Sequence, residues 1–409
     1  MNHRTWLVVF TLMVGLGVIY FFTSGGNTPF NHFVLLADAF LKGNFYIEGI
    51  YPWIEKAPLD ETRFFIVNPP MPAILLIPFV KIWGLSFPQQ LFAHIIGIGL
   101  SVSTFFLSLK IKKDDNKLAI WSALLIGIGS IVWFLSSVGS VWYLGQITAA
   151  FFLTLAIVES LDKKRPIILG ILLGATYLSR IHLVLTFPIF AFLLWKENKQ
   201  SLTTLKQSLT TLKQSLPLRG KKLIPLVLFS IPILLFIGFD FFYNFTRYGT
   251  IFNKGYFLIP GTQNEPWFAK GIMHPSYIIE DIKIAFLAMP KIISEFPYIR
   301  PSWVGMAIWL TTPAFIFAFW ANIKKQIVKL FWLAIGIVFL VVGLHGGTGF
   351  AQFGYRFAVD FYPFLTYLTI LGVKNQKGPH WYHWVFLSFG IIVNLWGVIW
   401  INKFNWIGW

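Results

Sequence analysis

Apolar runs long enough to cross a lipid bilayer recur from one end of this 409-residue sequence to the other. Most of them hold about 14 to 23 residues, and about 20 apolar residues in a helix cross roughly 30 Å of hydrocarbon. Because lipid satisfies no backbone hydrogen bond, runs of this kind fold as helices. Charged residues make up only 12% of the chain and the mean hydropathy is +0.68, which excludes a soluble domain. The sequence therefore predicts an all-α, polytopic membrane helical bundle without a large soluble domain.

The charges indicate how the chain lies in the membrane. The net charge is +17, but the Lys and Arg are scattered through short loops rather than gathered on one face, so nucleic acid is not an expected partner. The positive-inside rule gives eleven spans and an extracytoplasmic first loop in the plasma membrane. These spans fall near 5–23, 88–109, 118–136, 143–160, 166–179, 182–195, 223–244, 302–321, 328–345, 354–373 and 382–402. The proline-rich run 70–84 is short for a span and is predicted to be half-inserted or to lie on the surface.

This topology divides the chain into three parts. Residues 1–244 form an N-terminal transmembrane module with an external loop at 24–69, residues 245–300 form a second external loop, and residues 301–409 hold the C-terminal helices. The second loop is long and aromatic, and we expect a lid or docking surface there. The tandem repeat SLTTLKQ at 201–214 predicts a basic amphipathic helix on the cytosolic side.

Composition and motifs exclude several kinds of function. The chain has no cysteine, which rules out disulfides, iron–sulfur clusters and thiolate metal sites. We find neither the P-loop spacing of an ATP-driven pump nor the H-E-x-x-H motif of a zinc protease. Several external carboxylates leave divalent-metal use open, although no ligand spacing indicates a metal and no other cofactor is implied.

The first external loop holds a predicted short helix. At 100° per residue, Asn31, Leu35, Asp38 and Lys42 share one face, apolar residues fill the opposite arc, and Gly43 ends the helix. This pattern predicts a helix on the membrane surface with Asp38 turned toward water or a site. An Asp38–Lys42 pair on a solvated face is the alternative.

Ionisable residues near the ends of spans are the main candidates for a binding site, because they are costly in lipid. In the segment QFGYRFAVD, Tyr355 precedes Arg356, and we expect Asp360 to hold the Arg356 guanidinium ready for a phosphate. A purely structural Arg356–Asp360 ion pair is the alternative. Arg180 and Gln146 are predicted to open on the same side, unless Arg180 is an interfacial anchor and Gln146 belongs to an aromatic belt.

External carboxylates facing external arginines suit chemistry on a lipid-linked phosphate. A carboxylate would act as general base on an acceptor hydroxyl, and the cations would stabilise the charge that develops on the phosphate leaving group. One direct displacement would invert the sugar carbon. Asp240, inside a span, is either a buried hydrogen-bond partner or part of a site wall.

The chain resembles the GT-C superfamily of integral-membrane glycosyltransferases, which includes protein O-mannosyltransferases and aminoarabinose transferases. The resemblance rests on HFVLLADAFLKG, NPPMPAILLIPFVKIWG, WYLGQ, YLSR and QFGYRFAVDFYPF in this order, and on seven spans before the second external loop. It implies a polyprenyl-phosphate sugar donor and a glycan, lipid or protein acceptor at the cell surface.

This sequence departs from the GT-C pattern at one place. Asn31 and His32 stand where many relatives carry an Asp-Glu pair. The resemblance therefore implies that these two residues face substrate, while Asp38 or Glu55 supplies the catalytic carboxylate. A lipid-binding fold without activity, a transporter or flippase of lipid-linked sugars, and a structural scaffold are the alternatives. A transporter should show internal repeats, which this sequence does not.

Overall fold

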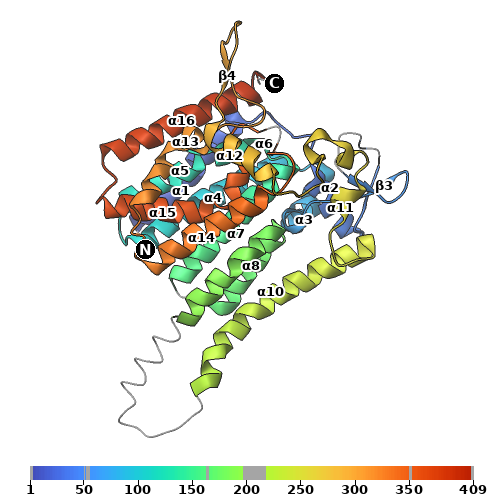
Figure 1. Ribbon diagram of the computed structural model, residues 1–409, viewed down its shortest axis with the longest axis horizontal. Coiled ribbons are helices and arrows are strands. Elements are labelled where there is room, and N and C mark those ends of the chain that lie inside the picture. The colour runs from blue at the N-terminus through green and yellow to red at the C-terminus, as the bar shows by residue number, and fades with distance from the viewer. Residues whose placement is uncertain are drawn as a thin grey trace.

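The computed structural model describes residues 3–49, 51, 56–162, 165–196, 218–349 and 352–406, with the backbone alone at 218–222. Glu55 and the SLTTLKQ repeat lie outside these ranges. The described chain is mostly helical, as predicted, and its few strands are short. Figure 1 shows the helices gathered into one bundle, with α10 (Leu218–Tyr248) along one side and α16 (Trp381–Asn402) along another.

Five of the described helices are long and apolar enough to span a membrane. They are α1 (His3–Thr23), α4 (Gln89–Ile111), α7 (Val141–Leu161), the part Leu223–Tyr248 of α10, and α16. A sixth candidate is the pair α5 (Asn116–Gly127) and α6 (Val132–Val138), which is bent by 55° at its break. Length and composition therefore support a membrane protein, and the total of eleven spans stays a prediction.

Other predicted spans are shorter or interrupted helices. They are α8 (Pro166–Tyr177), the segment Ile181–Lys196 that starts with the 3₁₀-helix η2 (Ile181–Thr186), α13 (Ile308–Thr311), η5 (Pro313–Trp320), α14 (Gln326–Val342), η6 (Arg356–Asp360) and α15 (Tyr362–Asn375). The prediction of one helix over 302–321 is wrong. Thr312 leaves the helical conformation at φ −145°, ψ 67°, because it precedes Pro313, whose ring disfavours helical backbone at the residue before it.

The first predicted loop folds onto the bundle. It contains α2 (His32–Leu41), α3 (Met71–Trp83), the 3₁₀-helix η1 (Gly84–Ser86) and a small antiparallel sheet of β1 (Ile47–Glu48), β3 (Arg63–Ile66) and β2 (Lys56–Pro58), in that order. The prediction that α2 lies on a surface with a polar face is wrong in part. Leu35 is 7% exposed and His32 is fully buried, because α3 packs against the helix. Gly43 ends α2 at φ +77°, as predicted.

The second predicted loop also has regular structure. It holds α11 (Gly255–Leu258), the 3₁₀-helices η3 (Thr262–Asn264) and η4 (Pro266–Phe268), α12 (Tyr277–Leu287) and a hairpin of β4 (Lys291–Ile292) and β5 (Ile299–Arg300). An antiparallel bridge between Met273 and His345 ties this loop to the chain that follows α14.

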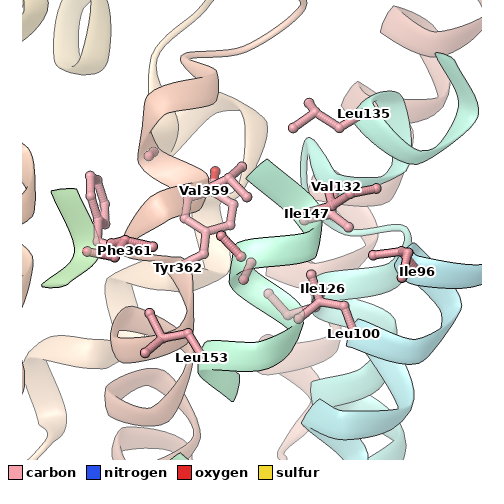
Figure 2. Close-up of a cluster of buried hydrophobic side chains, with 14 of the residues drawn as sticks. Ile96, Leu100, Ile126, Val132, Leu135, Ile147, Leu153, Val359, Phe361 and Tyr362 are labelled. Carbon is pink, nitrogen blue, oxygen red and sulfur yellow. The ribbon is translucent and has the colours of Figure 1, made fainter. Parts of the chain in front are cut away.

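The core lies where α4, α5, α6 and α7 meet η6 and the start of α15. Figure 2 shows buried side chains from these elements in one cluster: Ile96, Leu100, Ile126, Val132, Leu135, Ile147, Leu153, Val359, Phe361 and Tyr362. In lipid this packing rests mainly on van der Waals contact and on interhelical hydrogen bonds. Because α7 packs directly on η6, the core fixes the two elements that carry Gln146 and Arg356.

Candidate functional site

Two neighbouring cavities lie where α7, η2, η6 and the second loop meet. The first has a volume of about 430 Å³ and the second about 560 Å³, which is the size range of small-ligand sites. Five residues line both cavities, so the two share a boundary: Trp142, Tyr256, His345, Arg356 and Phe357. Arg180 and His182 line the first cavity only, and Trp267 and Asp281 line the second only.

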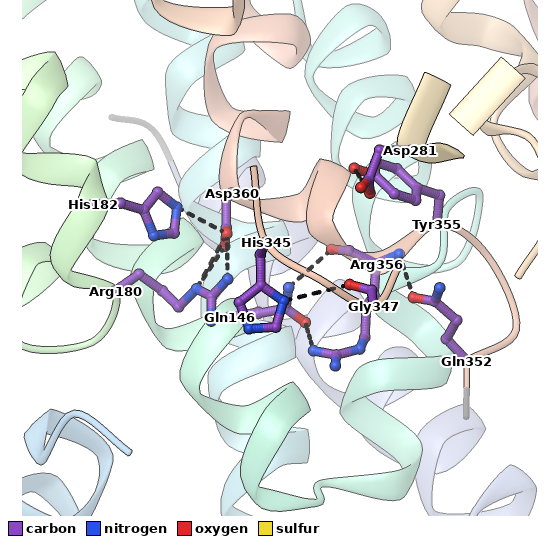
Figure 3. Close-up of polar contacts among 10 residues, drawn as sticks. All are labelled: Gln146, Arg180, His182, Asp281, His345, Gly347, Gln352, Tyr355, Arg356 and Asp360. Atoms are coloured by element: carbon purple, nitrogen blue, oxygen red, sulfur yellow. Dashed lines mark hydrogen bonds and ion pairs between the residues drawn. The ribbon is translucent and has the colours of Figure 1, made fainter. Parts of the chain in front are cut away.

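Arg180 lines the first cavity and is held by a buried carboxylate that lies behind the cavity wall. Its Nη2 lies 2.7 Å from Oδ2 of Asp360, and its Nε also donates to this carboxylate (Figure 3). His182 Nε2 lies 3.1 Å from the same oxygen. Asp360 is fully buried, while the Arg180 side chain keeps 23% of its surface exposed. Arg180 is therefore oriented from behind and open toward the cavity.

Arg356 is buried but contacts no carboxylate within the described part of the chain. It is 8% exposed, and its Nη1 donates to Oε1 of Gln146 at 3.3 Å and its Nε to the carbonyl oxygen of Gly349 at 3.3 Å. Gln146 Nε2 donates back to the carbonyl oxygen of Arg356 at 3.1 Å, and Arg356 N–H donates to Gln352 Oε1. These acceptors are neutral, so the guanidinium charge is not cancelled, and a buried cation in this situation attracts an anion.

The predicted Arg356–Asp360 ion pair is wrong. Residues 356–360 form a 3₁₀-helix, in which side chains three apart eclipse one another and those four apart diverge. Asp360 therefore turns to Arg180 and His182, and Arg356 turns to Gln146 (Figure 3). Asp360 thus pairs with one of the two guanidinium groups, and the other keeps its charge, so the first cavity has an excess of positive charge.

Tyr355 reaches away from the first cavity. Its hydroxyl donates a 2.7 Å hydrogen bond to Oδ1 of Asp281, which is fully buried on α12. The other carboxyl oxygen, Oδ2, is buried and has no hydrogen-bond partner among the described residues. Desolvation raises the pKa of Asp281 to about 7, and the hydrogen bond from Tyr355 opposes this rise. Asp281 is therefore partly protonated near neutral pH.

Of the predicted loop residues, the three that the structure describes, Asn31, His32 and Asp38, line neither cavity. Asp38 is paired with Lys42 at 2.7 Å and lines a separate cavity of about 110 Å³ near Glu48 and Tyr51. Asn31 makes no side-chain capping bond to α2. His32 packs against Phe30 and Trp142, and Glu55 lies outside the described residues.

Asp240 is a buried hydrogen-bond partner and not part of a site wall. It accepts a 2.7 Å bond from the hydroxyl of Tyr177, and neither cavity includes it. Gln146 lines neither cavity, but it is fully buried beside Arg356, so it supports that guanidinium and does not belong to an exposed aromatic belt.

Three residues of the site were not singled out from the sequence. His182 follows YLSR by two positions, so its proximity to Arg180 was available from the sequence. His345 and Asp281 come from separate loops, and no local pattern marks them. Within the described ranges no group of three or more His, Asp or Glu could hold a metal ion.

The fold and the site together define a helical membrane protein with a cationic cavity. No protein-family model matches the chain, and no curated protein matches it either. Similar solved structures are those of the oligosaccharyltransferase of Archaeoglobus fulgidus. In the apo form it shares 13% identity at a TM-score of 0.44, over 96% of this chain and 55% of the other. The complex of this enzyme, AglB, with an inhibitory peptide and a dolichol-phosphate shares 12% identity at a TM-score of 0.45, over 99% of this chain and 56% of the other. This chain thus spans about half the length of these proteins, and a likeness this distant identifies neither a family nor an activity.

Proposed function

We propose that this chain is an integral-membrane glycosyltransferase of the plasma membrane that uses a polyprenyl-phosphate-linked sugar. It transfers the sugar to a cell-surface glycan, lipid or protein on the extracytoplasmic face. The observation that carries the proposal is Arg356: a buried guanidinium without a carboxylate partner in the described chain, on the boundary of two cavities.

In this proposal the first cavity takes the donor phosphate. Arg180 and Arg356 both line it, and two guanidinium groups can donate to the oxygens of one phosphate. Gln146 and Asp360 orient these two groups, and Tyr355 holds the neighbouring turn through Asp281. Apolar residues of the same cavity, such as Val341, Ile272 and Phe257, suit the isoprenoid end of the donor.

The two arginines would act mainly on the leaving group. When the bond between the sugar carbon and the phosphate oxygen breaks, its electron pair stays on the oxygen. Cations fixed in a low-dielectric site stabilise that charge more than water does, and the loss of one such donor lowers the rate by about 10²- to 10³-fold. A single displacement of this kind inverts the sugar carbon.

The test is sugar transfer from radiolabelled polyprenyl-phosphate sugars in membranes. We expect Arg356→Ala to lower kcat/KM by about 10²-fold or more. Arg356→Lys should lower it less, since Lys keeps the charge but not the two parallel N–H donors of the guanidinium. Arg63→Ala is the matched control, because Arg63 pairs with Asp60 on an exposed turn of the first loop. Equal transfer by Arg356→Ala and the parent would refute the proposed site. Translocation of lipid-linked sugar by a parent that transfers none would instead identify a flippase.

A further inference from the structure

His345 occupies the boundary between the two cavities. It lines both, together with Arg356, Phe357, Trp142 and Tyr256. Of these five side chains, only the imidazole is a proton acceptor at neutral pH, because phenol and guanidinium groups stay protonated and the other two have no such group. The residue was not among those predicted from the sequence.

The imidazole is held in place from several sides. The rings of Phe268, Tyr256 and Phe357 meet it edge-on with centroids 5.4, 6.0 and 6.1 Å away. The backbone around it is tied to the second loop, since His274 N–H donates to the carbonyl oxygen of Leu344 at 2.7 Å. A side chain fixed in this way keeps one orientation, which proton transfer requires.

The hydrogen bonding of His345 leaves one nitrogen available. Nδ1 lies 3.4 Å from the carbonyl oxygen of Gly347 (Figure 3). A carbonyl oxygen only accepts, so this contact favours the tautomer with the proton on Nδ1 and a lone pair on Nε2. The hydrogen bonds found among the described residues do not involve Nε2.

The surroundings of His345 keep the imidazole neutral. Arg180, His182 and Arg356 line the first cavity with it, and cationic neighbours disfavour a further positive charge on the ring. An anion between the two arginines would cancel part of their charge and so make protonation of the imidazole easier. The imidazole would therefore become a stronger base when a phosphate occupies the first cavity.

We propose that His345 is the general base that accepts the proton of an acceptor hydroxyl bound in the second cavity. This inference rests on the proposed function. The hydroxyl proton moves to Nε2 while the acceptor oxygen bonds to the sugar carbon. The bond from that carbon to the phosphate oxygen breaks, and its electron pair leaves with the polyprenyl phosphate. The imidazolium then returns its proton to water.

The second cavity suits a sugar or another hydroxyl-bearing acceptor. Trp267, Phe268 and Tyr277 line it, and aromatic faces stack well on the C–H faces of sugar rings. Its wall also contains Gly347 and Gly349, both with positive φ, a backbone conformation that glycine adopts without steric cost. A Cβ at Gly349 would lie 2.8 Å from Oε1 of Gln352 and 3.2 Å from Nε of Arg356, so this glycine lets the two side chains pack against the turn.

Two variants test the proposal in the full-length protein. His345→Gln keeps a polar side chain without a basic nitrogen, and we expect kcat to fall by about 10²- to 10⁴-fold. Binding of a radiolabelled polyprenyl phosphate should change less than about 3-fold, because a base adds little to ground-state binding. His345→Ala should recover activity in added imidazole, and recovery should grow with the basicity of substituted imidazoles. A structural role would show no such dependence.

His274→Gln is the matched control. His274 lies in the second loop, bonds to Ser276 and lines neither cavity, so its variant should transfer sugar within about 2-fold of the parent, as for a surface change. Asp38→Asn and Glu55→Gln test the two carboxylates that the sequence predicts as catalytic.

The outcomes separate the two proposals. Three results would overturn the role of His345 and leave the glycosyltransferase proposal standing. The first is parent-like transfer by His345→Gln, and the second is loss of transfer only in Asp38→Asn or Glu55→Gln. The third is absence of imidazole rescue in a folded His345→Ala that binds donor. A parallel loss of donor binding would make His345 a phosphate ligand instead of a base. If the parent neither binds polyprenyl phosphate nor transfers sugar, both proposals fall.

Discussion

Arg180 and Asp360 lie 180 positions apart in the sequence and form an ion pair of 2.7 Å behind the first cavity. The carboxylate is fully buried, and its Oδ2 also lies 3.1 Å from Nε2 of His182. The pair joins the turn after α8 to the start of α15, so it fixes one wall of the cavity and one of its two cations.

Removal of this carboxylate should destabilise the protein. We expect Asp360→Ala to lower the free energy of unfolding by about 3 kcal/mol, because it leaves the Arg180 charge partly buried and unpaired. Thermal unfolding in detergent micelles measures the change. Asp60→Ala, which breaks the exposed pair with Arg63, should leave the Tm almost unchanged. Equal Tm values for both variants would show that the Arg180–Asp360 pair does not hold the wall.

Gln146 should act on activity through Arg356 alone. It makes two hydrogen bonds with Arg356: its Oε1 accepts one from the guanidinium, and its Nε2 donates one to the backbone carbonyl oxygen. We expect Gln146→Met, which keeps the volume, to lower kcat/KM for sugar transfer by about 10-fold, since each lost bond is worth about 1 kcal/mol.

A double-mutant cycle checks that route. In an Arg356→Ala background, Gln146→Met should cause almost no additional loss, because residues in one hydrogen-bond network are not additive. Additive losses would mean that Gln146 contacts substrate independently of Arg356.

Asp281 should give the protein a pH-dependent stability. Its α12 helix belongs to the second loop, outside the candidate spans, and its pKa is raised from 3.8 to about 7 by burial, with Glu280 adding to the rise. A carboxyl with a raised pKa favours the folded state while it is protonated. Its contribution is thus complete below about pH 4 and is lost as the pH rises to about 7.

Asp281→Asn removes this titration and keeps an oxygen that can accept the bond from Tyr355. Relative to the parent, we expect the variant to gain stability from pH 4 to pH 7, by on the order of 2–4 kcal/mol, and to gain no more above pH 8. Denaturant unfolding at a series of pH values measures the difference. A constant difference over this range would show that Asp281 titrates as an ordinary exposed carboxyl does.

The sequence predicted the class of the protein and part of its site, for physical reasons that differ by residue. Apolar run length alone indicates membrane helices, and the cost of burying charge in lipid singled out Arg180, Arg356 and Asp360. The four-residue spacing of Arg356 and Asp360 led to the wrong pair, because the prediction assumed an α-helix where the chain forms a 3₁₀-helix. No local pattern distinguishes the two.

Residues brought in by tertiary packing could not be predicted. His345 reaches the site because its backbone bridges to Met273 in the second loop, and Asp281 because Tyr355 binds it across 74 positions. Helical periodicity predicts that Asp38 faces a site, but α3 packs against that helix, and the carboxylate pairs locally with Lys42. Helical periodicity shows which residues share a face and not which neighbour covers it.

Gly354 should be intolerant of any side chain, because it lets the site turn pack on the break between α5 and α6. A Cβ at this position would overlap Cγ2 of Ile131 and lie 3.1 Å from Cγ2 of Thr311. Ile131 is fully buried at the start of α6, so it has little room to move. We expect Gly354→Ala to destabilise the protein by about 1–3 kcal/mol and to lower sugar transfer, since Tyr355 and Arg356 follow directly.

Ile131→Ala makes room for the new methyl group, so the double variant Gly354→Ala/Ile131→Ala should unfold at a higher temperature than the sum of the two single losses predicts. Strict additivity of the two Tm changes would show that the turn does not depend on this contact.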